Sequence, residues 1–205
     1  MKAILLNLSA WALLPFMDVI AKYLSAELSF FQITWARYFF TVFWTLPFMF
    51  IFFRKKLTFS ENPKLQILRG LTLFSANICF FYAISIISMA KALTLAFVAP
   101  LVTTALSPIL LGEKVGIKKW TAVIVGFIGS LIVIRPGFIE FNLATIAALG
   151  TGCLYGVYLI ITRKLHSTDN PLLTLLLTGI VGGTVSTFFV PIVWVNPTNI
   201  QWLWL

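Results

Sequence analysis

The sequence predicts an all-α polytopic membrane protein, and three observations lead to that fold class. Of the 205 residues, 60% are hydrophobic and only 10% are charged, whereas a soluble domain carries about 25% charged residues. The apolar residues form long runs, and most Lys and Arg residues occupy the short gaps between them. The net charge of +9 therefore indicates membrane loops and no nucleic-acid partner, because nucleic-acid binders cluster their cations on one solvated face.

Seven apolar runs have the length that a bilayer-spanning helix needs, which is about 20 residues. In hydrocarbon every backbone N–H and C=O must be bonded within its own segment, and none of the runs alternates polar and apolar residues as a barrel strand does. Each run is therefore predicted to be a helix, with an eighth beginning near the end of the chain. The predicted spans are residues 4–24, 30–53, 68–87, 90–111, 117–134, 143–161 and 172–195.

The Lys and Arg residues in the gaps predict the orientation. Three lie on one side: Lys22, Lys91 and Arg135. The other side has more Lys and Arg residues and includes the N-terminus. The positive-inside rule therefore predicts a multi-pass inner-membrane protein with this second side in the cytoplasm. Eleven lie on that side: Lys2, Arg54, Lys55, Lys56, Lys64, Arg69, Lys114, Lys118, Lys119, Arg163 and Lys164.

Spans one and two carry charges at membrane depth. Asp18 lies about 9 Å below the outer end of span one at about 1.5 Å per residue, and Arg37 lies at a similar depth in span two. Lys22 is one helical turn beyond Asp18 on the same face. A lone charge at mid-membrane costs about 2.5 to 3.5 kcal/mol, so we expect Asp18 to pair with Arg37, Lys22 or both. The pair either joins the two spans or serves substrate binding or gating.

Span three carries the polar residues Ser75, Asn77 and Tyr82 in an otherwise apolar run. Asn77 is the most costly of them to leave unpaired, and we favour it as a polar contact for a substrate, with Tyr82 as a further candidate. The alternative is a hydrogen bond between helices, which contributes about 0.6 kcal/mol in comparable cases.

Span four contains two prolines. Pro100 and Pro108 each lack the N–H of a helical residue and are predicted to kink the span. A stripe of small residues along the span either lines a transport pathway or packs closely against another helix. It consists of Ala92, Ala96, Ala99, Thr103 and Ser107. Glu113, at the end of the span among lysines, is expected to be a helix-end charge and not a coupling site.

Span six has small residues at a four-residue spacing, which favours helix packing. They are Ala144, Ala148, Gly152 and Gly156. Tyr155 and Tyr158 lie beside this ridge and are candidates to present rings or hydroxyls to a substrate.

An internal repeat is expected from two similar stretches. DVIAKYL (18–24) is loosely similar in sequence to YLIITRKL (158–165), which lies about 140 residues or five spans later. A repeat with an odd number of spans enters the membrane from the opposite face, which is an inverted repeat of the kind found in secondary transporters. We expect residues 1–137 to form the first five-helix repeat. Residues 138–205 would be an incomplete second repeat, with two helices and the start of a third, so the sequence is expected to be truncated.

Five segments resemble the EamA branch of the drug/metabolite transporter superfamily, and within it permeases of the S-adenosylmethionine uptake type. They are AKYLS (21–25), WARYFFTVFWTLPF (35–48), ILRGLTLFSANICFFYAISI (67–86), AKALTLAFVAPLVTTALSPILLGEK (90–114) and WTAVIVGFIGSLIVIRPG (120–137). The resemblance implies two inverted five-helix halves that move a small metabolite by alternating access.

The expected function is therefore secondary transport of an amino acid, an amine or an S-adenosylmethionine-like compound. The expected partners are the lipid bilayer and a small-molecule substrate, and the sequence leaves open whether the protein forms a homodimer. The sequence has no Gly-rich phosphate loop, no His-Glu-x-x-His and no nucleophile elbow, so we expect no enzyme, no cofactor and no metal. A membrane-embedded enzyme or a non-transporting scaffold is the alternative. Substrate, direction and coupling ion stay open.

Overall fold

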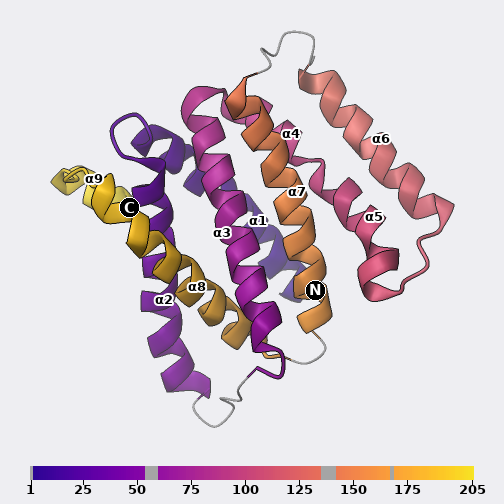
Figure 1. The fold of residues 1–205 in the computed structure, drawn as a ribbon, viewed down its shortest axis with the longest axis horizontal. Helices are drawn as coiled ribbons and strands as arrows, with labels where there is room; N and C mark the ends of the chain where they lie inside the picture. Colours follow the sequence, from indigo (N-terminus) through magenta and orange to yellow (C-terminus); the bar gives the residue numbers. More distant parts are fainter. Residues whose placement is uncertain (1, 54–59, 135–141, 167–168) are drawn as a thin grey trace.

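The computed structural model describes residues 2–53, 60–134, 142–166 and 169–205, and every regular element in these ranges is helical (Figure 1). Each predicted span appears as a helix near its predicted place, except that span four is divided into two. The elements are α1 (Lys2–Leu24), α2 (Phe30–Phe53), α3 (Pro63–Ile86), α4 (Met89–Ala96), α5 (Ala99–Leu111), α6 (Ile117–Ile134), α7 (Leu143–Leu165), α8 (Pro171–Phe189), a 3₁₀ turn (Val190–Ile192) and α9 (Asn199–Trp204).

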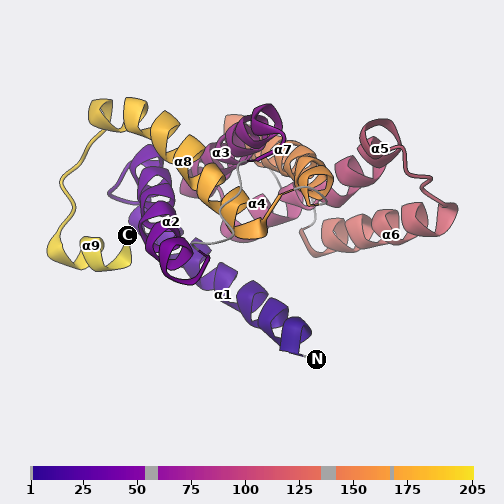
Figure 2. The same ribbon diagram turned by 90° about the horizontal axis from the view of Figure 1, so that it is seen from below.

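The helices α3 and α7 form the centre of the molecule. The helix α8 packs on α3 and on α2, while α4 and α5 pack on the other side of α7, with α6 outermost. Figure 2 shows α1 projecting away from this arrangement toward the N-terminus. Its second half returns to the core through Ala21 and Leu24, which are buried against Phe81 and other α3 residues.

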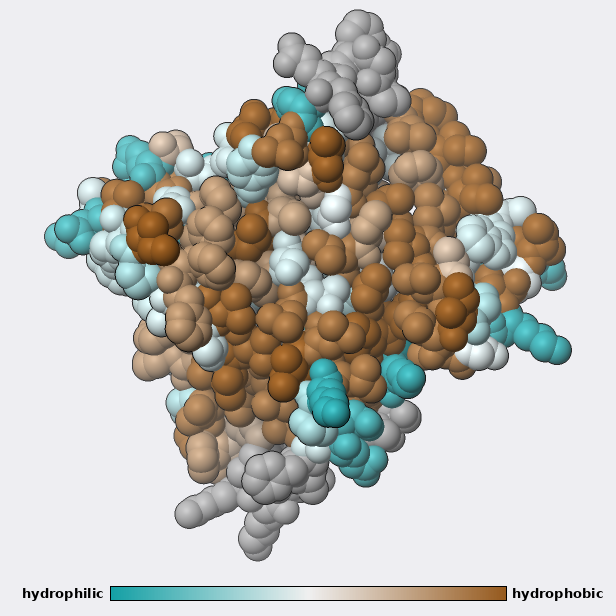
Figure 3. Space-filling view, viewed as in Figure 1, coloured by the Kyte–Doolittle hydropathy of each residue, from teal (hydrophilic) through white to brown (hydrophobic). Residues whose placement is uncertain are grey.

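The surface identifies the environment of these helices. Within the described residues, four segments have the length and hydropathy to cross a membrane: Pro63–Ile86, Met89–Leu111, Leu143–Leu165 and Pro171–Ile192. Large apolar side chains are exposed on most helices. Figure 3 shows apolar residues covering the middle of one face, with hydrophilic residues gathered toward its edges. The protein is an all-α polytopic membrane protein.

The small residues of α7 allow close contact with α4 and α5. A Cβ added at Gly152 would lie 2.7 Å from the Ala96 carbonyl oxygen, and one at Gly156 would lie 2.9 Å from that of Ala99. Only a residue without a side chain lets two backbones approach this closely. The packing interpretation of the span-six ridge is therefore confirmed.

The division of span four occurs at the first proline. The helix α4 ends at Ala96 and α5 begins at Ala99, with Pro100 in its first turn, where a missing N–H costs little. The helix α5 continues through Pro108 to Leu111, and the predicted kink at Pro108 stays a prediction. One absent N–H removes a single bond of the helical ladder, and the other bonds of α5 are kept.

The small stripe of span four contacts α7. Ala92 and Ser107 are buried, and the Thr103 hydroxyl donates to the Gly156 carbonyl at 3.3 Å. In the described structure the stripe therefore packs against a helix.

The start of α3 corrects one sequence-based assignment. The helix begins at Pro63, earlier than the predicted residue 68, because proline is favoured in the first turn. Arg69, counted among the cytoplasmic gap residues because it lies at the start of the predicted span, is in the second turn of α3 with only 5% of its surface exposed.

The segment after α8 is fastened to α2. The Gln32 side chain, which is fully buried, donates to the Val195 carbonyl at 2.9 Å and accepts from the Val195 N–H at 3.1 Å. Gln201 of α9 donates to Glu27, in the turn after α1. These bonds hold α9 against the α1–α2 end of the molecule.

Candidate functional site

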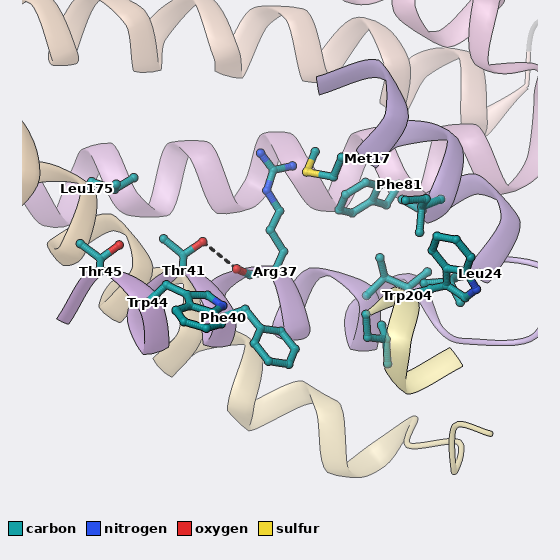
Figure 4. Close-up of a pocket in the computed structure, with 14 residues that line it drawn as sticks. Met17, Leu24, Arg37, Phe40, Thr41, Trp44, Thr45, Phe81, Leu175 and Trp204 are labelled. Atoms are coloured by element: carbon teal, nitrogen blue, oxygen red, sulfur yellow. Dashed lines mark hydrogen bonds between the residues drawn. The ribbon is translucent and has the colours of Figure 1, made fainter. Parts of the chain in front are cut away.

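A cavity of about 630 Å³ lies between α1, α2, α8 and α9, with Phe81 of α3 in its wall (Figure 4). Met17, Ala21 and Leu24 form the α1 side. Four aromatic rings add flat apolar surface: Phe40, Trp44, Phe81 and Trp204. This mostly apolar lining with few polar groups is typical of a small-molecule site.

Arg37 is the charged side chain in the cavity lining. Figure 4 shows it extending from α2 toward Met17. Its Nη1 donates to the Asn77 Oδ1 at a long 3.4 Å, and no carboxylate of the described residues lies within 4.0 Å of it. A guanidinium has five N–H donors, so most of those of Arg37 are free for a ligand or for water.

Asn77 joins α3 to α2. It accepts from Arg37, and its Nδ2 donates to the Tyr38 hydroxyl oxygen at 2.7 Å. Both bonds run between helices, and Asn77 is buried. In the structure Asn77 therefore forms the hydrogen bonds between helices that were the alternative to a substrate contact.

The expected ion pair of Asp18 is not formed in the described structure. Lys22 donates to the carbonyl oxygen of Ile84 and, at 3.5 Å, to that of Ile87, so it serves the exposed carbonyls at the end of α3. Arg37 is drawn toward Asn77. Asp18 is half-buried, and no Lys or Arg nitrogen of the described residues lies within 4.0 Å of its carboxylate. The prediction that Asp18 pairs with Lys22 or Arg37 is wrong for this conformation.

A second polar cluster surrounds Arg69 at the junction of α3, α7 and α8. Its Nε donates to the Thr162 hydroxyl at 2.7 Å and its Nη2 to the Tyr158 hydroxyl at 2.8 Å. Its Nη1 donates to the Thr174 carbonyl at 3.0 Å and to the Thr178 hydroxyl. The guanidinium carbon also lies 4.7 Å from the centre of the Tyr158 ring. Four donated bonds and one ring thus stabilise this buried cation.

Gln66 extends the Arg69 cluster toward the end of α3. Its Nε2 donates to the Asp169 carboxylate and to the Thr174 hydroxyl. Asp169 also accepts from the Ser60 hydroxyl and the Glu61 N–H. The cluster therefore joins the beginnings of α3 and α8 with the last turns of α7.

The remaining candidate residues lie outside the Arg37 cavity lining. Tyr155 stacks on Tyr158 with ring centres 5.4 Å apart. Tyr82 meets the edge of Phe30 at 5.6 Å. These tyrosines contact helices and rings of the bundle.

Glu113 forms an ion pair beyond the end of α5. Its Oε1 lies 2.9 Å from the Arg163 Nη2 of α7, and its Oε2 accepts from the Ser107 hydroxyl at 3.0 Å. The side chains of Arg163 and Glu113 are 57% and 32% exposed. The pair links α5 to α7 at a partly solvated position.

Comparison with known proteins identifies the family. The EamA-like transporter family matches residues 1–135. The chain belongs to this family. Its relatives include the S-adenosylmethionine uptake transporter of Rickettsia prowazekii, which is 28% identical over 96% of this chain and 68% of the relative. That of Rickettsia bellii is 30% identical over 88% of this chain and 62% of the relative.

A different named substrate occurs among the relatives. The riboflavin transporter of Vibrio cholerae is 36% identical over 40% of this chain and 27% of the relative. The EamA chain spans about two thirds of the length of the S-adenosylmethionine relatives. No solved structure matches it. Its relatives are transporters and not enzymes, in agreement with the sequence-based expectation.

Sequence reasoning missed several residues of this EamA chain that the structure places in its polar clusters. Arg69 and Gln66 are three positions apart, on one face of a helix. The Asn-Pro pair at 62–63 marks a helix start that would have placed Gln66 inside α3 together with Arg69. Tyr38 lies next to Arg37 in sequence, but only the packing of α2 on α3 shows that its hydroxyl meets Asn77.

Proposed function

We propose that this EamA-family protein is a secondary transporter that moves a small metabolite by alternating access, with the Arg37 cavity as its substrate site. The substrate classes are amino acids, amines and S-adenosylmethionine-like compounds. Family membership supports transport of a small metabolite. The observation that supports the site is a guanidinium with one long hydrogen bond in an apolar, aromatic-walled cavity.

The proposal extends to architecture and location. The protein is placed in a cell inner membrane with a cytoplasmic N-terminus, on the strength of the Lys and Arg distribution. Residues 1–137 are proposed as the first of two inverted five-helix repeats and 138–205 as part of the second. Cysteine labelling of single-cysteine variants from both sides of the membrane tests the orientation. Cross-linking in the membrane tests the homodimer.

Uptake and counterflow into proteoliposomes test the function itself. The intact protein is reconstituted, and uptake of radiolabelled amino acids, amines, S-adenosylmethionine and riboflavin is compared with that of protein-free liposomes. We expect saturable uptake of at least one compound and its exchange against the same compound inside. Chromatography of the internal contents must recover the compound unchanged. Conversion of a compound without its accumulation would instead indicate the membrane-enzyme alternative.

A further inference from the structure

The charged and hydroxyl side chains of the cavity lie along one face of α2. Arg37, Thr41 and Thr45 line the cavity at intervals of four residues, which places them above one another on the helix. The lining side chains from α1, α3, α8, α9 and Leu205 are aliphatic, aromatic or, in Met17, a thioether. Among the described residues that line the cavity, a substrate therefore meets a charged side chain only at Arg37.

The guanidinium of Arg37 has most of its donors without a protein partner. Figure 4 shows it extending from α2 toward Met17. Its hydrogen bond within the described residues goes to the amide oxygen of Asn77 at 3.4 Å, and that oxygen carries no charge. A charge in a largely apolar site is costly unless it is paired. The site therefore favours a ligand that brings negative charge to Arg37.

The same lining opposes a cationic ligand. None of the described residues that line the cavity is an Asp or a Glu. An ammonium group there would have hydroxyls and aromatic rings as partners, and it would share the cavity with the like charge of Arg37. Charges act on one another more strongly in an apolar site than in water. An amine without an acid group is therefore disfavoured.

A single cation favours a single negative charge. A carboxylate carries one charge, and its two oxygens match the paired N–H groups of a guanidinium. A phosphate monoester matches the same donors, but it brings nearly two negative charges. The second of these would stay without a partner in the cavity, which is costly. The charge and the donor geometry of Arg37 therefore favour a carboxylate.

The rest of the lining favours an apolar or aromatic body. Phe40, Trp44, Phe81 and Trp204 offer ring faces and edges, and Met17 offers a polarizable thioether. The volume of about 630 Å³ lies in the usual range of small-molecule sites, about 300 to 1,000 Å³.

We infer that Arg37 is a specificity-determining residue that selects substrates with a carboxylate on an apolar or aromatic body, whether or not they also carry an ammonium. The inference rests on the proposed function and narrows its substrate classes. Amino acids and S-adenosylmethionine-like compounds stay included through their carboxylate, and amines without one are excluded. Since hydrogen bonds to charged groups are among the stronger ones in proteins, removal of the carboxylate is expected to weaken binding by about 10- to 100-fold.

Binding of matched compounds to the unaltered protein tests the inference. The intact protein is purified in detergent, and isothermal titration calorimetry at neutral pH gives the dissociation constants of 3-phenylpropanoate, phenylalanine, 3-phenylpropanamide and phenethylamine. The amide replaces the carboxylate by a neutral group of similar shape. Indole-3-propanoate, tryptophan, indole-3-propanamide and tryptamine form a second series with a larger ring, and phenethyl phosphate tests the preference for a single charge.

The outcomes separate the inference from the proposed function. Binding of the acids and amino acids at least about 10-fold tighter than that of the amides and amines supports the inference. An amide or an amine that binds as tightly as its acid overturns it, and so does the absence of binding by both acids. Tighter binding of phenethyl phosphate than of 3-phenylpropanoate overturns the choice of a carboxylate. The proposed function fails only if the uptake and counterflow assay detects no transport.

Variants assign the discrimination to Arg37. In Arg37→Gln the preference for an acid over its amide should fall to about unity, because acid binding weakens by about 10-fold or more and amide binding does not. Arg163→Gln, the same change at an exposed arginine outside the cavity, should keep the full preference. An unchanged preference in Arg37→Gln shows a structural role and overturns the assignment. If Arg37→Gln does not fold, Arg37→Lys keeps the charge and loses the two-pronged geometry, and an unchanged preference there overturns the assignment equally.

Discussion

The ring of Tyr38 lies directly on the backbone of Gly182. A Cβ added at Gly182 would lie 2.6 Å from both Cε1 and Cζ of that ring, which is closer than van der Waals contact. The bare backbone of α8 therefore lets the Tyr38 hydroxyl reach Asn77, and Asn77 in turn bonds Arg37 at the cavity. Gly182, which does not line the cavity, is thus linked through Tyr38 and Asn77 to the cation that does.

Gly182→Ala is expected to destabilise the protein by about 1 to 3 kcal/mol, because overpacking displaces a buried ring. The measurement is thermal denaturation in detergent. Gly183→Ala is the matched control, since its added Cβ would lie 3.8 Å from the Tyr38 Cβ, an ordinary contact. If the two alanine variants have the same melting midpoint, the contact with Tyr38 does not limit the packing of α8.

Gly152→Ala should destabilise the α7 contact with span four by a similar amount. The added methyl group meets the Ala96 carbonyl, a backbone group that moves only if the end of α4 moves. Gly150→Ala is the control on the same helix, because its nearest neighbour is the Cys79 Sγ at 4.0 Å. Thermal denaturation of both variants, compared with the unaltered protein, checks the prediction. Equal midpoints would contradict it.

Glu113→Gln is expected to cost less than about 1 kcal/mol and to leave uptake intact. The partner Arg163 is exposed, and solvent screens such a pair. The measurements are thermal denaturation in detergent and uptake in proteoliposomes. Arg163→Gln and the double variant complete a double-mutant cycle that isolates the energy of the ion pair. Loss of uptake in Glu113→Gln, with an unchanged melting midpoint, would make Glu113 a coupling residue.

Arg69→Gln is expected to cost at least about 2 kcal/mol, because the four hydrogen bonds that the buried guanidinium donates are disrupted. Arg163→Gln is again the control, as the same change at an exposed position. The melting midpoints of the two variants in detergent are compared with that of the unaltered protein. Similar midpoints would mean that the Arg69 cluster does not stabilise the bundle.

The helices were predictable because their apolar length is a property of the local sequence. Each of the seven predicted spans contains a helix in the structure, and the predicted break of span four occurs near Pro100, which lacks the N–H of a helical residue. The ridge that includes Gly152 and Gly156 was also predictable, since helical spacing puts these residues on one face. The inverted repeat stays a prediction.

The polar partners were not predictable, because they depend on how helices far apart in sequence pack together. Asp18 and Lys22 look like a pair on one face of a helix, yet Lys22 bonds carbonyls of α3. Arg69 looks like a loop charge because it lies at the start of the predicted span, yet its acceptors come from α7 and α8. The residue type indicates that each buried polar group needs a hydrogen-bond partner. Which group becomes that partner depends on how the helices pack.

The position of Arg69 has a consequence for the synthesis of the protein. Its acceptors lie between 89 and 109 residues later in the chain, so α3 leaves the ribosome long before α7 and α8 exist. Until then the guanidinium must be accommodated by water, by lipid phosphate or by the insertion machinery, since an uncompensated charge in hydrocarbon is costly. The set of hydrogen bonds around Arg69 is therefore complete only once α8 has been made, which makes closure of this cluster a late event in assembly.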